Sequence, residues 1–359
     1  MYAYKYKTLI MRILLSPISW IYSIVLLIRH KLYDWGILKS KSFSVPTICI
    51  GNLALGGTGK TPHTEYLINL LKKKCRVAVL SRGYGRKTKG FILADENSTC
   101  SDIGDEPLMY HINHDDITVA VDEERCDGVK KLMLQENAPE VILLDDAYQH
   151  RKINPGFNIL LTEYYNIYKK DMLLPAGKLR DIKSQAKRAD VILVTKSPQI
   201  LLPYDKREVL RTINAKPYQK VFFTTINYKS IKPINDAAKE TTLENMKSIY
   251  LFCGIANPYP LEDHLKRQYN TVITSYYSDH HCYTEKDIDT ILEGFNDVIG
   301  KNKIIITTEK DLMRLTKHSY IRRFDNVPLF TIPIEVHFNR QEEKIEFNNL
   351  ILKYVGKDF

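Results

Sequence analysis

The sequence predicts an α/β fold whose core is a mainly parallel sheet flanked by helices. Short apolar runs rich in β-branched residues recur along the chain, as expected of strands that are buried on both faces. The segments between these runs are long enough for crossover helices, which a parallel sheet requires. The runs cover residues 44–52, 75–81, 117–121, 141–146, 157–163 and 190–196.

The composition is that of a globular protein with room for about two domains. The chain has 359 residues, of which 44% are hydrophobic and 26% charged, which excludes disordered and fibrous classes. The formal net charge of +10 suits an anionic partner: nucleic acid, an anionic membrane surface or a phosphorylated substrate. The six cysteines form no C-x-x-C pair, so we expect reduced thiols rather than a zinc site.

The N-terminus carries an apolar segment between basic flanks. Residues 13–28 have no charge, but this stretch is shorter than the ~20 residues of a membrane-spanning helix, and Pro17 interrupts it. A buried core helix and a signal peptide are the alternatives. We predict that residues 1–35 form a helix lying in a membrane interface, with Trp20 and Tyr22 at the level of the lipid headgroups.

A glycine-rich loop follows the first predicted strand. The segment GNLALGGTGKT (51–61) lies between a strand and a helix, which is the context of a phosphate-binding loop. Its backbone N–H groups and the helix N-terminus would hold a nucleotide, Lys60 would reach the β- and γ-phosphates, and the Thr61 hydroxyl would bind Mg²⁺. The strict motif has glycine where this chain has Ala54. The predicted nucleotide-binding residues are Gly56, Gly57, Thr58, Gly59, Lys60 and Thr61.

A second acidic motif is the natural partner of this loop. The run VILLDDAYQH (141–150) is an apolar strand that ends in Asp145 and Asp146. Along an extended strand these two side chains would point to opposite sides, so one could face Mg²⁺ while the other orients a neighbour. The two motifs together predict a magnesium–nucleotide site, a P-loop NTPase-like fold and phosphoryl transfer.

Two other classes of nucleotide protein fit less well. A nucleotide-switch protein of the metal-insertion GTPase type is the alternative that we keep, but it needs an [NT]-K-x-D motif, and residues 195–198 lack the Asp. An ATP-driven nucleic-acid protein would need basic stripes with interleaved aromatic residues, and the chain has no such stripe. We therefore expect no nucleic-acid partner.

The composition changes near residues 215–235, which marks a domain boundary. Residues 221–234 alternate more and contain polar residues, like an antiparallel or linking strand, and a helix is expected at 284–299 between further strands. These later strands cover residues 248–255, 271–281, 303–311 and 327–336. We predict three parts: the N-terminal helix (1–35), a P-loop kinase domain (36–217) and a smaller α/β domain (218–359).

Eight motifs, in this order, resemble those of the tetraacyldisaccharide 4'-kinases, the lipid A 4'-kinases of Gram-negative bacteria. The motifs are GNLALGGTGKTP, SRGYGRK, GDEP, DDAYQHR, LLPAGKLRD, CGIANP, SDHH and TTEKD, spread over about residues 45–315. An N-terminal membrane-proximal helix is also a trait of this family. The resemblance implies transfer of the γ-phosphate of MgATP to the 4'-hydroxyl of a tetraacylated glucosamine disaccharide 1-phosphate, which gives lipid IVA in lipopolysaccharide biosynthesis. It also implies a peripheral protein on the cytoplasmic face of the inner membrane.

The resemblance also implies roles for individual residues. Asp105 of GDEP pairs with His280 of SDHH, and we expect Asp105 to accept the proton of the sugar hydroxyl while His280 orients it. The reverse assignment, with His280 as the base, remains open. Lys60 joins this catalytic set, and Glu106 assists the metal.

Further residues of these motifs are candidates for contacts with the substrate or the transition state. They carry cationic, aromatic or imidazole groups suited to phosphate or sugar. Asp181 stands where other family members often carry Glu, so its role is open, and His281 receives no assignment. The candidates are Arg82, Tyr84, Arg125, His150 and Arg180.

Overall fold

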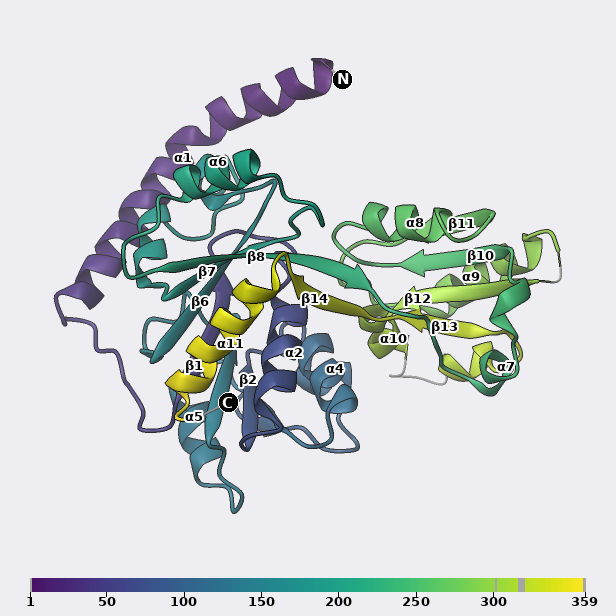
Figure 1. The fold of residues 1–359 in the computed structure, drawn as a ribbon, viewed down its shortest axis with the longest axis horizontal. Coiled ribbons are helices and arrows are strands. Elements are labelled where there is room, and N and C mark those ends of the chain that lie inside the picture. Colours follow the sequence, from purple (N-terminus) through teal and green to yellow (C-terminus); the bar gives the residue numbers. More distant parts are fainter. Residues whose placement is uncertain (1, 301, 316–319, 358–359) are drawn as a thin grey trace.

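The structure, a computed structural model, describes residues 2–300, 302–315 and 320–357. Figure 1 shows two sheets side by side, with one long helix along the outside of the larger sheet. The predicted α/β class is confirmed. The short 3-10 helices are Tyr168–Lys170, Lys183–Arg188, Leu243–Asn245 and Ile321–Phe324.

The larger sheet has nine strands in the order β14-β8-β7-β6-β1-β5-β2-β4-β3. All neighbours are parallel except the two outer pairs, β14 with β8 and β3 with β4. Its strands are β1 (Thr47–Asn52), β2 (Val77–Ser81), β3 (Ile92–Leu93), β4 (Thr118–Val121), β5 (Val141–Asp145), β6 (Phe157–Glu163), β7 (Val191–Thr195), β8 (Lys220–Tyr228) and β14 (Ile334–Phe338).

Helices cover both faces of this sheet, which is why its central strands are apolar on both sides. In β1, Ile48 and Ile50 belong to one hydrophobic core, while Cys49 between them belongs to the core on the opposite face. The accompanying helices are α2 (Lys60–Leu71), α3 (Cys100–Ile103), α4 (Asp105–Asn113), α5 (Arg125–Met133), α6 (Pro203–Ile213) and α11 (Gln341–Tyr354).

The smaller sheet has five strands in the order β11-β10-β12-β13-β9, parallel except at β9. Its strands are β9 (Lys232–Pro233), β10 (Ser248–Cys253), β11 (Thr271–Tyr276), β12 (Lys303–Thr308) and β13 (Leu329–Ile332). The helices that follow or flank them are α7 (Asp236–Lys239), α8 (Tyr259–Lys266), α9 (Glu285–Asp297) and α10 (Glu309–Leu315).

The division of the chain between the two sheets differs from the predicted boundary at residue 218. Strand β8 lies in the larger sheet, and β14 returns from the smaller sheet to pair with it (Figure 1). Helix α11 then packs against the larger sheet, because Phe347, Ile351 and Leu352 are buried in that core. In the sequence, β14 and α11 look like one more strand and helix of an α/β domain. Their pattern does not indicate which of the two sheets they join.

The N-terminal helix α1 (Tyr2–Asp34) is longer than the uncharged stretch 13–28, because the basic flanks are helical too. Pro17 lies inside it. Within the part of the chain that the structure describes, Met11–Asp34 is the one helix long and apolar enough to cross a membrane, by length and composition only, and 11% of its most apolar window is buried.

Candidate active site

The predicted site residues of the kinase domain gather at the carboxyl ends of the central strands. The glycine-rich loop follows β1, and Ile50 of β1 pairs with Asp145 at the end of β5. Crevices beyond the carboxyl ends of parallel strands are where α/β proteins bind ligands. Gly59 has a left-handed φ of 87° as it enters α2, a conformation that favours glycine, and Lys60 begins the helix.

Buried polar side chains that were not predicted from the sequence form hydrogen bonds with the glycine-rich loop. His63 lies 2.7 Å from the Gly59 carbonyl through Nδ1 and 2.9 Å from the Thr224 hydroxyl through Nε2. Burial lowers the pKa of His63 to about 4, so the ring is neutral, with Nδ1 as the donor. Asn52 donates to the Thr58 hydroxyl at 2.8 Å. These bonds preorganise the loop.

The two adjacent acids occupy different environments. Asp145 is fully buried, and burial together with the negative charges of Glu106 and Asp146 raises its pKa. Its Oδ1 has no hydrogen-bond partner among the residues that the structure describes. Asp146 has a left-handed φ of 48°, so the pair does not continue as an extended strand, in contrast to the prediction.

Asp146 is instead the centre of a cationic cluster. Its carboxylate lies 3.7 Å from Lys60 Nζ and accepts from Arg180, with Nη1 at 3.1 Å. Although burial raises its pKa, the charges of Lys60 and Arg180 outweigh this effect and hold the pKa of Asp146 below its usual value. Arg180 also donates to the Asn52 side chain at 2.6 Å, which ties it to the loop.

Glu106 joins the loop to the smaller sheet. It accepts from the Thr61 hydroxyl at 2.8 Å and from Lys310 Nζ at 2.6 Å, and Lys310 belongs to α10. Burial raises the pKa of Glu106, but the charge of Lys310 outweighs burial and the carboxylate remains ionised.

Asp105 and His280 meet across the two sheets. His280 Nδ1 lies 3.1 Å from Asp105 Oδ2, and the same oxygen accepts from Arg314 Nη2 at 2.8 Å. Burial raises the pKa of Asp105, but the His280 hydrogen bond and the Arg314 charge hold it well below its usual value. The hydrogen bond with Asp105 in turn raises the pKa of His280. His280 has a left-handed φ of 58°, which is uncommon outside glycine and occurs at functional sites.

The remaining candidates lie at different depths around this site. The Tyr84 ring lies 5.2 Å from the His280 ring and is exposed, as is Arg82. Arg125 is buried and donates to backbone carbonyls of Asp122 and Asp145. Burial, with the charges of Arg125 and Arg82, lowers the pKa of His150 to about 4.

Comparisons with known proteins agree with this geometry. Residues 11–354 match the family model described as tetraacyldisaccharide-1-P 4'-kinase. The chain belongs to this family. The tetraacyldisaccharide 4'-kinase of Bacteroides thetaiotaomicron is 43% identical over 355 residues, which cover 96% of this chain and 93% of the relative. That of Flavobacterium johnsoniae is 41% identical over 350 residues, 97% and 98% of the two chains.

A solved structure agrees too. LpxK from Aquifex aeolicus, in complex with ATP, superposes with a TM-score of 0.73 and 29% identity, over 96% of this chain and 99% of that one. The predicted family and P-loop kinase fold are therefore confirmed, and the nucleotide-switch alternative is not favoured.

The oxygens near the loop fit the requirements of Mg²⁺. Among the described residues, no three His, Cys, Asp or Glu side chains form a metal-binding group. Mg²⁺ in kinases, however, usually takes one or two protein carboxylates and fills its other positions with phosphates and water. The unpartnered Oδ1 of buried Asp145 suits that role, close to Glu106 and the Thr61 hydroxyl.

Lys310 and Arg314, the cations that pair with Glu106 and Asp105, were not among the residues predicted from the sequence. The motif TTEKD contains Lys310 and was a usable signal, because a motif of a kinase family that has no assigned role is a candidate for the site. His281, left unassigned, lies 3.0 Å from Asp287, which completes the capping box of α9.

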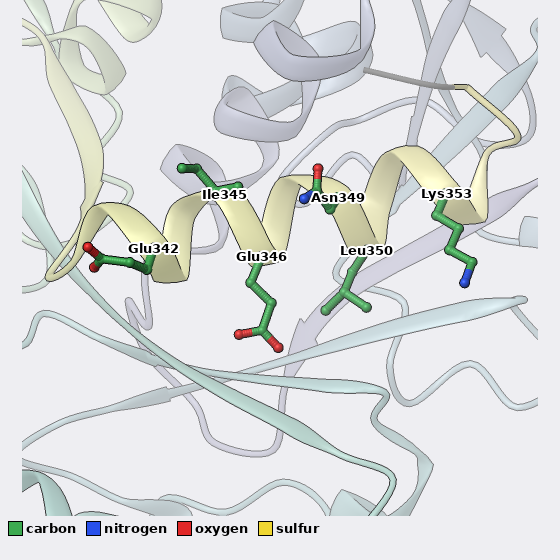
Figure 2. Close-up of a pocket in the computed structure, with 6 residues that line it drawn as sticks. All are labelled: Glu342, Ile345, Glu346, Asn349, Leu350 and Lys353. Carbon is green, nitrogen blue, oxygen red and sulfur yellow. The ribbon is translucent and has the colours of Figure 1, made fainter.

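A shallow hollow on α11 is separate from this site. Figure 2 shows its lining side chains, all of which come from that one helix, and no predicted site residue is among them. The lining residues are Glu342, Ile345, Glu346, Asn349, Leu350 and Lys353.

Proposed function

We propose that this protein is an ATP-dependent kinase that phosphorylates the 4'-hydroxyl of a tetraacylated glucosamine disaccharide 1-phosphate, with lipid IVA as the product. The observation that carries the proposal is the meeting of Asp105 and His280 beside the phosphate loop, in a chain of the tetraacyldisaccharide-1-P 4'-kinase family. Phosphoryl transfer needs positioning and charge neutralisation more than covalent chemistry, and this site offers both.

The loop residues Gly56 to Thr61 bind the phosphates of ATP. The backbone N–H groups and the N-terminus of α2 hold the phosphate oxygens, and Lys60 moves from Asp146 toward the γ-phosphate as negative charge develops there. Arg180 stays on Asp146, so that carboxylate keeps a cationic partner.

Asp145 and the Thr61 hydroxyl would hold Mg²⁺, and Glu106 and Asp146 are the further candidates to assist it. The ion, when bound, neutralises charge on the β- and γ-phosphate oxygens. The raised pKa of Asp145 supports this assignment, because a buried carboxylate surrounded by other acids is favoured in its ionised form once a cation joins it.

The Asp105–His280 pair accepts the proton of the sugar hydroxyl. Arg314 donates to Asp105 through both Nε and Nη2, which makes that carboxylate a weak base. The Nε2 of His280 is therefore the better acceptor, and Asp105 orients the ring and stabilises the imidazolium. This choice reverses the roles expected from the sequence.

Arg82, Tyr84, Arg125 and His150 contact the acceptor or the transition state. Arg82 and Tyr84 are exposed, and the Tyr84 ring lies beside His280, so these two residues suit the sugar and its phosphate. Arg125 and His150 lie deeper and supply positive potential and a neutral imidazole near the two adjacent acids.

Helix α1 lies on the membrane surface. It is amphipathic, with polar side chains toward the protein and apolar side chains toward the outside. Its polar side chains Ser19, Tyr22 and His30 face the protein and form hydrogen bonds there. Its outward face is apolar and exposed, which suits lipid rather than water. The exposed residues are Met11, Ile13, Leu14, Ile18, Trp20, Ile21, Ile24, Val25, Leu27 and Ile28. Because ATP is cytoplasmic, we place the protein peripherally on the cytoplasmic face of the inner membrane.

The direct test is transfer of labelled γ-phosphate from ATP to a tetraacyl disaccharide 1-phosphate in detergent micelles. We expect a labelled product whose phosphate is at the 4'-position by mass spectrometry and NMR. Transfer to water or to a nucleotide, with none to the disaccharide, would contradict the proposed acceptor. Omission of Mg²⁺ with a chelator should abolish transfer.

A further inference from the structure

Helix α1 is seated on the two loops that carry Asp146 and Arg180. Ser19 donates to the Leu173 carbonyl and accepts from the Ala176 N–H, both at 3.0 Å. Arg29 donates to the Gln149 carbonyl at 3.1 Å. The helix that faces lipid on one side therefore contacts, on its other side, the segments 145–151 and 171–181.

Two of these contacts fall on adjacent residues of the second loop. The Tyr22 hydroxyl donates to the Arg180 carbonyl at 2.9 Å, and His30 Nε2 lies 2.6 Å from Asp181 Oδ1. The side chains of His30 and Asp181 are 3% and 0% exposed, so this pair is as buried as a core contact. Asp181 Oδ2 has no protein partner, so His30 is the one side chain that pairs with this carboxylate among the described residues.

The tautomer of His30 follows from its neighbours. A carboxylate only accepts, so Nε2 carries the proton toward Asp181. Arg151 Nη1 lies 3.4 Å from Nδ1 and donates to the His30 carbonyl at 3.1 Å, which leaves Nδ1 as an acceptor. Asp181 and Arg151 thus hold the His30 ring at both of its nitrogens, as expected of a residue that positions a loop.

Arg180 connects these contacts of α1 to the phosphate loop through hydrogen bonds. Its backbone N–H donates to the Leu53 carbonyl at 2.8 Å, and its guanidinium binds Asp146 and Asn52. Asn52 in turn holds Thr58 of the loop. A continuous chain of hydrogen bonds thus runs from α1 to the residues that would bind nucleotide.

We infer that Tyr22, His30 and Asp181 are positioning residues for the nucleotide site. Through their contacts, the packing of α1 on the loop 171–181 determines where Arg180 and Asp146 lie. This inference rests on the proposed ATP site. Its consequence is that α1 contributes to MgATP affinity as well as to lipid contact, so the membrane helix and the phosphate loop form one unit.

The test is MgATP affinity, measured by calorimetry on the full-length protein in detergent without any lipid substrate. We expect His30→Ala, His30→Asn and Asp181→Asn to weaken binding by about 10-fold, because small misplacements of binding groups have effects of this order or larger. His30→Gln keeps an N–H donor near the Nε2 position and should stay within about 3-fold of the wild type. Lys187→Gln removes the ion pair of Lys187 with Asp34 of α1, which does not involve these two loops, and should bind as the wild type does.

Wild-type affinity in both His30→Ala and Asp181→Asn would overturn the inference, as would a loss in Lys187→Gln equal to that in His30→Ala. If thermal unfolding shows that His30→Ala does not fold, Tyr22→Phe decides, because it removes only one hydroxyl. We expect a smaller loss of affinity there, and no loss would count against the inference. A failure of the proposed acceptor appears separately, as MgATP binding by the wild type without phosphate transfer to the disaccharide.

Discussion

At the scale of single residues, the pairing of His280 with Asp105 predicts the pH dependence of the reaction. The pKa of His280 is raised, so its neutral form, which accepts the proton, is lost as the pH falls through a value above its usual ~6.5. We expect kcat at saturating substrates to fall on this acid limb. Asp105→Asn removes the carboxylate that raises the pKa, so the limb should shift to lower pH and kcat should drop by about 10²-fold.

The measurement is a pH–rate profile for the wild type, Asp105→Asn and His280→Gln. An acid limb below about pH 4, with full loss of activity in Asp105→Asn, would instead make Asp105 the proton acceptor. The limb should be absent from the residual activity of His280→Gln.

Lys60 is the residue whose charge is placed for the transferred phosphate. Lys60→Met should lower kcat by about 10²-fold or more, because one group that stabilises transition-state charge is lost. Lys73, exposed beyond the other end of α2, provides the control, since Lys73→Met removes the same charge far along the helix. Equal activity of the two variants would contradict the role of Lys60.

Candidate site residues can be recognised in the sequence where they lie close together in the chain. The loop 51–61 and the acids Asp145 and Asp146 are recognisable because each set lies in one short segment next to a strand. Arg314 lies outside these motifs, and the sequence alone does not pair Lys310 of TTEKD with Glu106, because the partners lie about 200 residues apart in the chain. Pairing across sheets has no local sequence signature.

At the scale of elements, α1 shows why an apolar pattern alone is ambiguous. Its inward face is the polar one, so the hydrophobic stretch 13–28 does not pack as a core helix would. His30 reads in the sequence as part of a basic flank and Asp181 as a departure from the family, and only the packing of α1 on the loop 171–181 joins them. The lipid-facing role of the outward side is testable without disturbing this packing.

We predict that Ile21→Ser, Ile24→Ser and Ile28→Ser together weaken binding to anionic vesicles by about 10²-fold. Each exposed side chain would lose roughly 1 kcal/mol of partitioning, and serine has a helix propensity close to that of isoleucine. Co-sedimentation with vesicles measures this. The matched control is Leu134→Ser, Ile200→Ser and Ile299→Ser, three residues that are exposed elsewhere. Equal losses in the two sets would contradict the interfacial helix.

At the scale of the whole molecule, the proposed active site lies where the two sheets meet. Helix α10 packs on α4, and its Leu312 and Met313 are buried in the core of the larger sheet. The predicted division at residue 218 misses this, because periodicity identifies strands and helices but not the sheet that each one joins. The proposed catalytic pair, Asp105 and His280, belongs to this interface, so we expect the stability of the interface and the activity to be linked.

Arg314 is the residue at which this link can be measured. The side chains of Arg314, Asp105 and Asp311 are 6%, 8% and 0% exposed, so Arg314→Met removes this cation from two buried carboxylates. We expect a loss of about 3–5 kcal/mol in the free energy of unfolding, measured by urea denaturation at neutral pH. Asp105 has a lowered pKa, so the contribution of its pair with Arg314 is present above pH ~4 and is lost as the pH falls below this value. There, the wild type and Arg314→Met should converge in stability.

The control is Lys229→Met, which breaks an exposed ion pair with Glu335 and should change stability by less than about 1 kcal/mol. A similarly small effect of Arg314→Met would mean that the two sheets are held together without this ion pair.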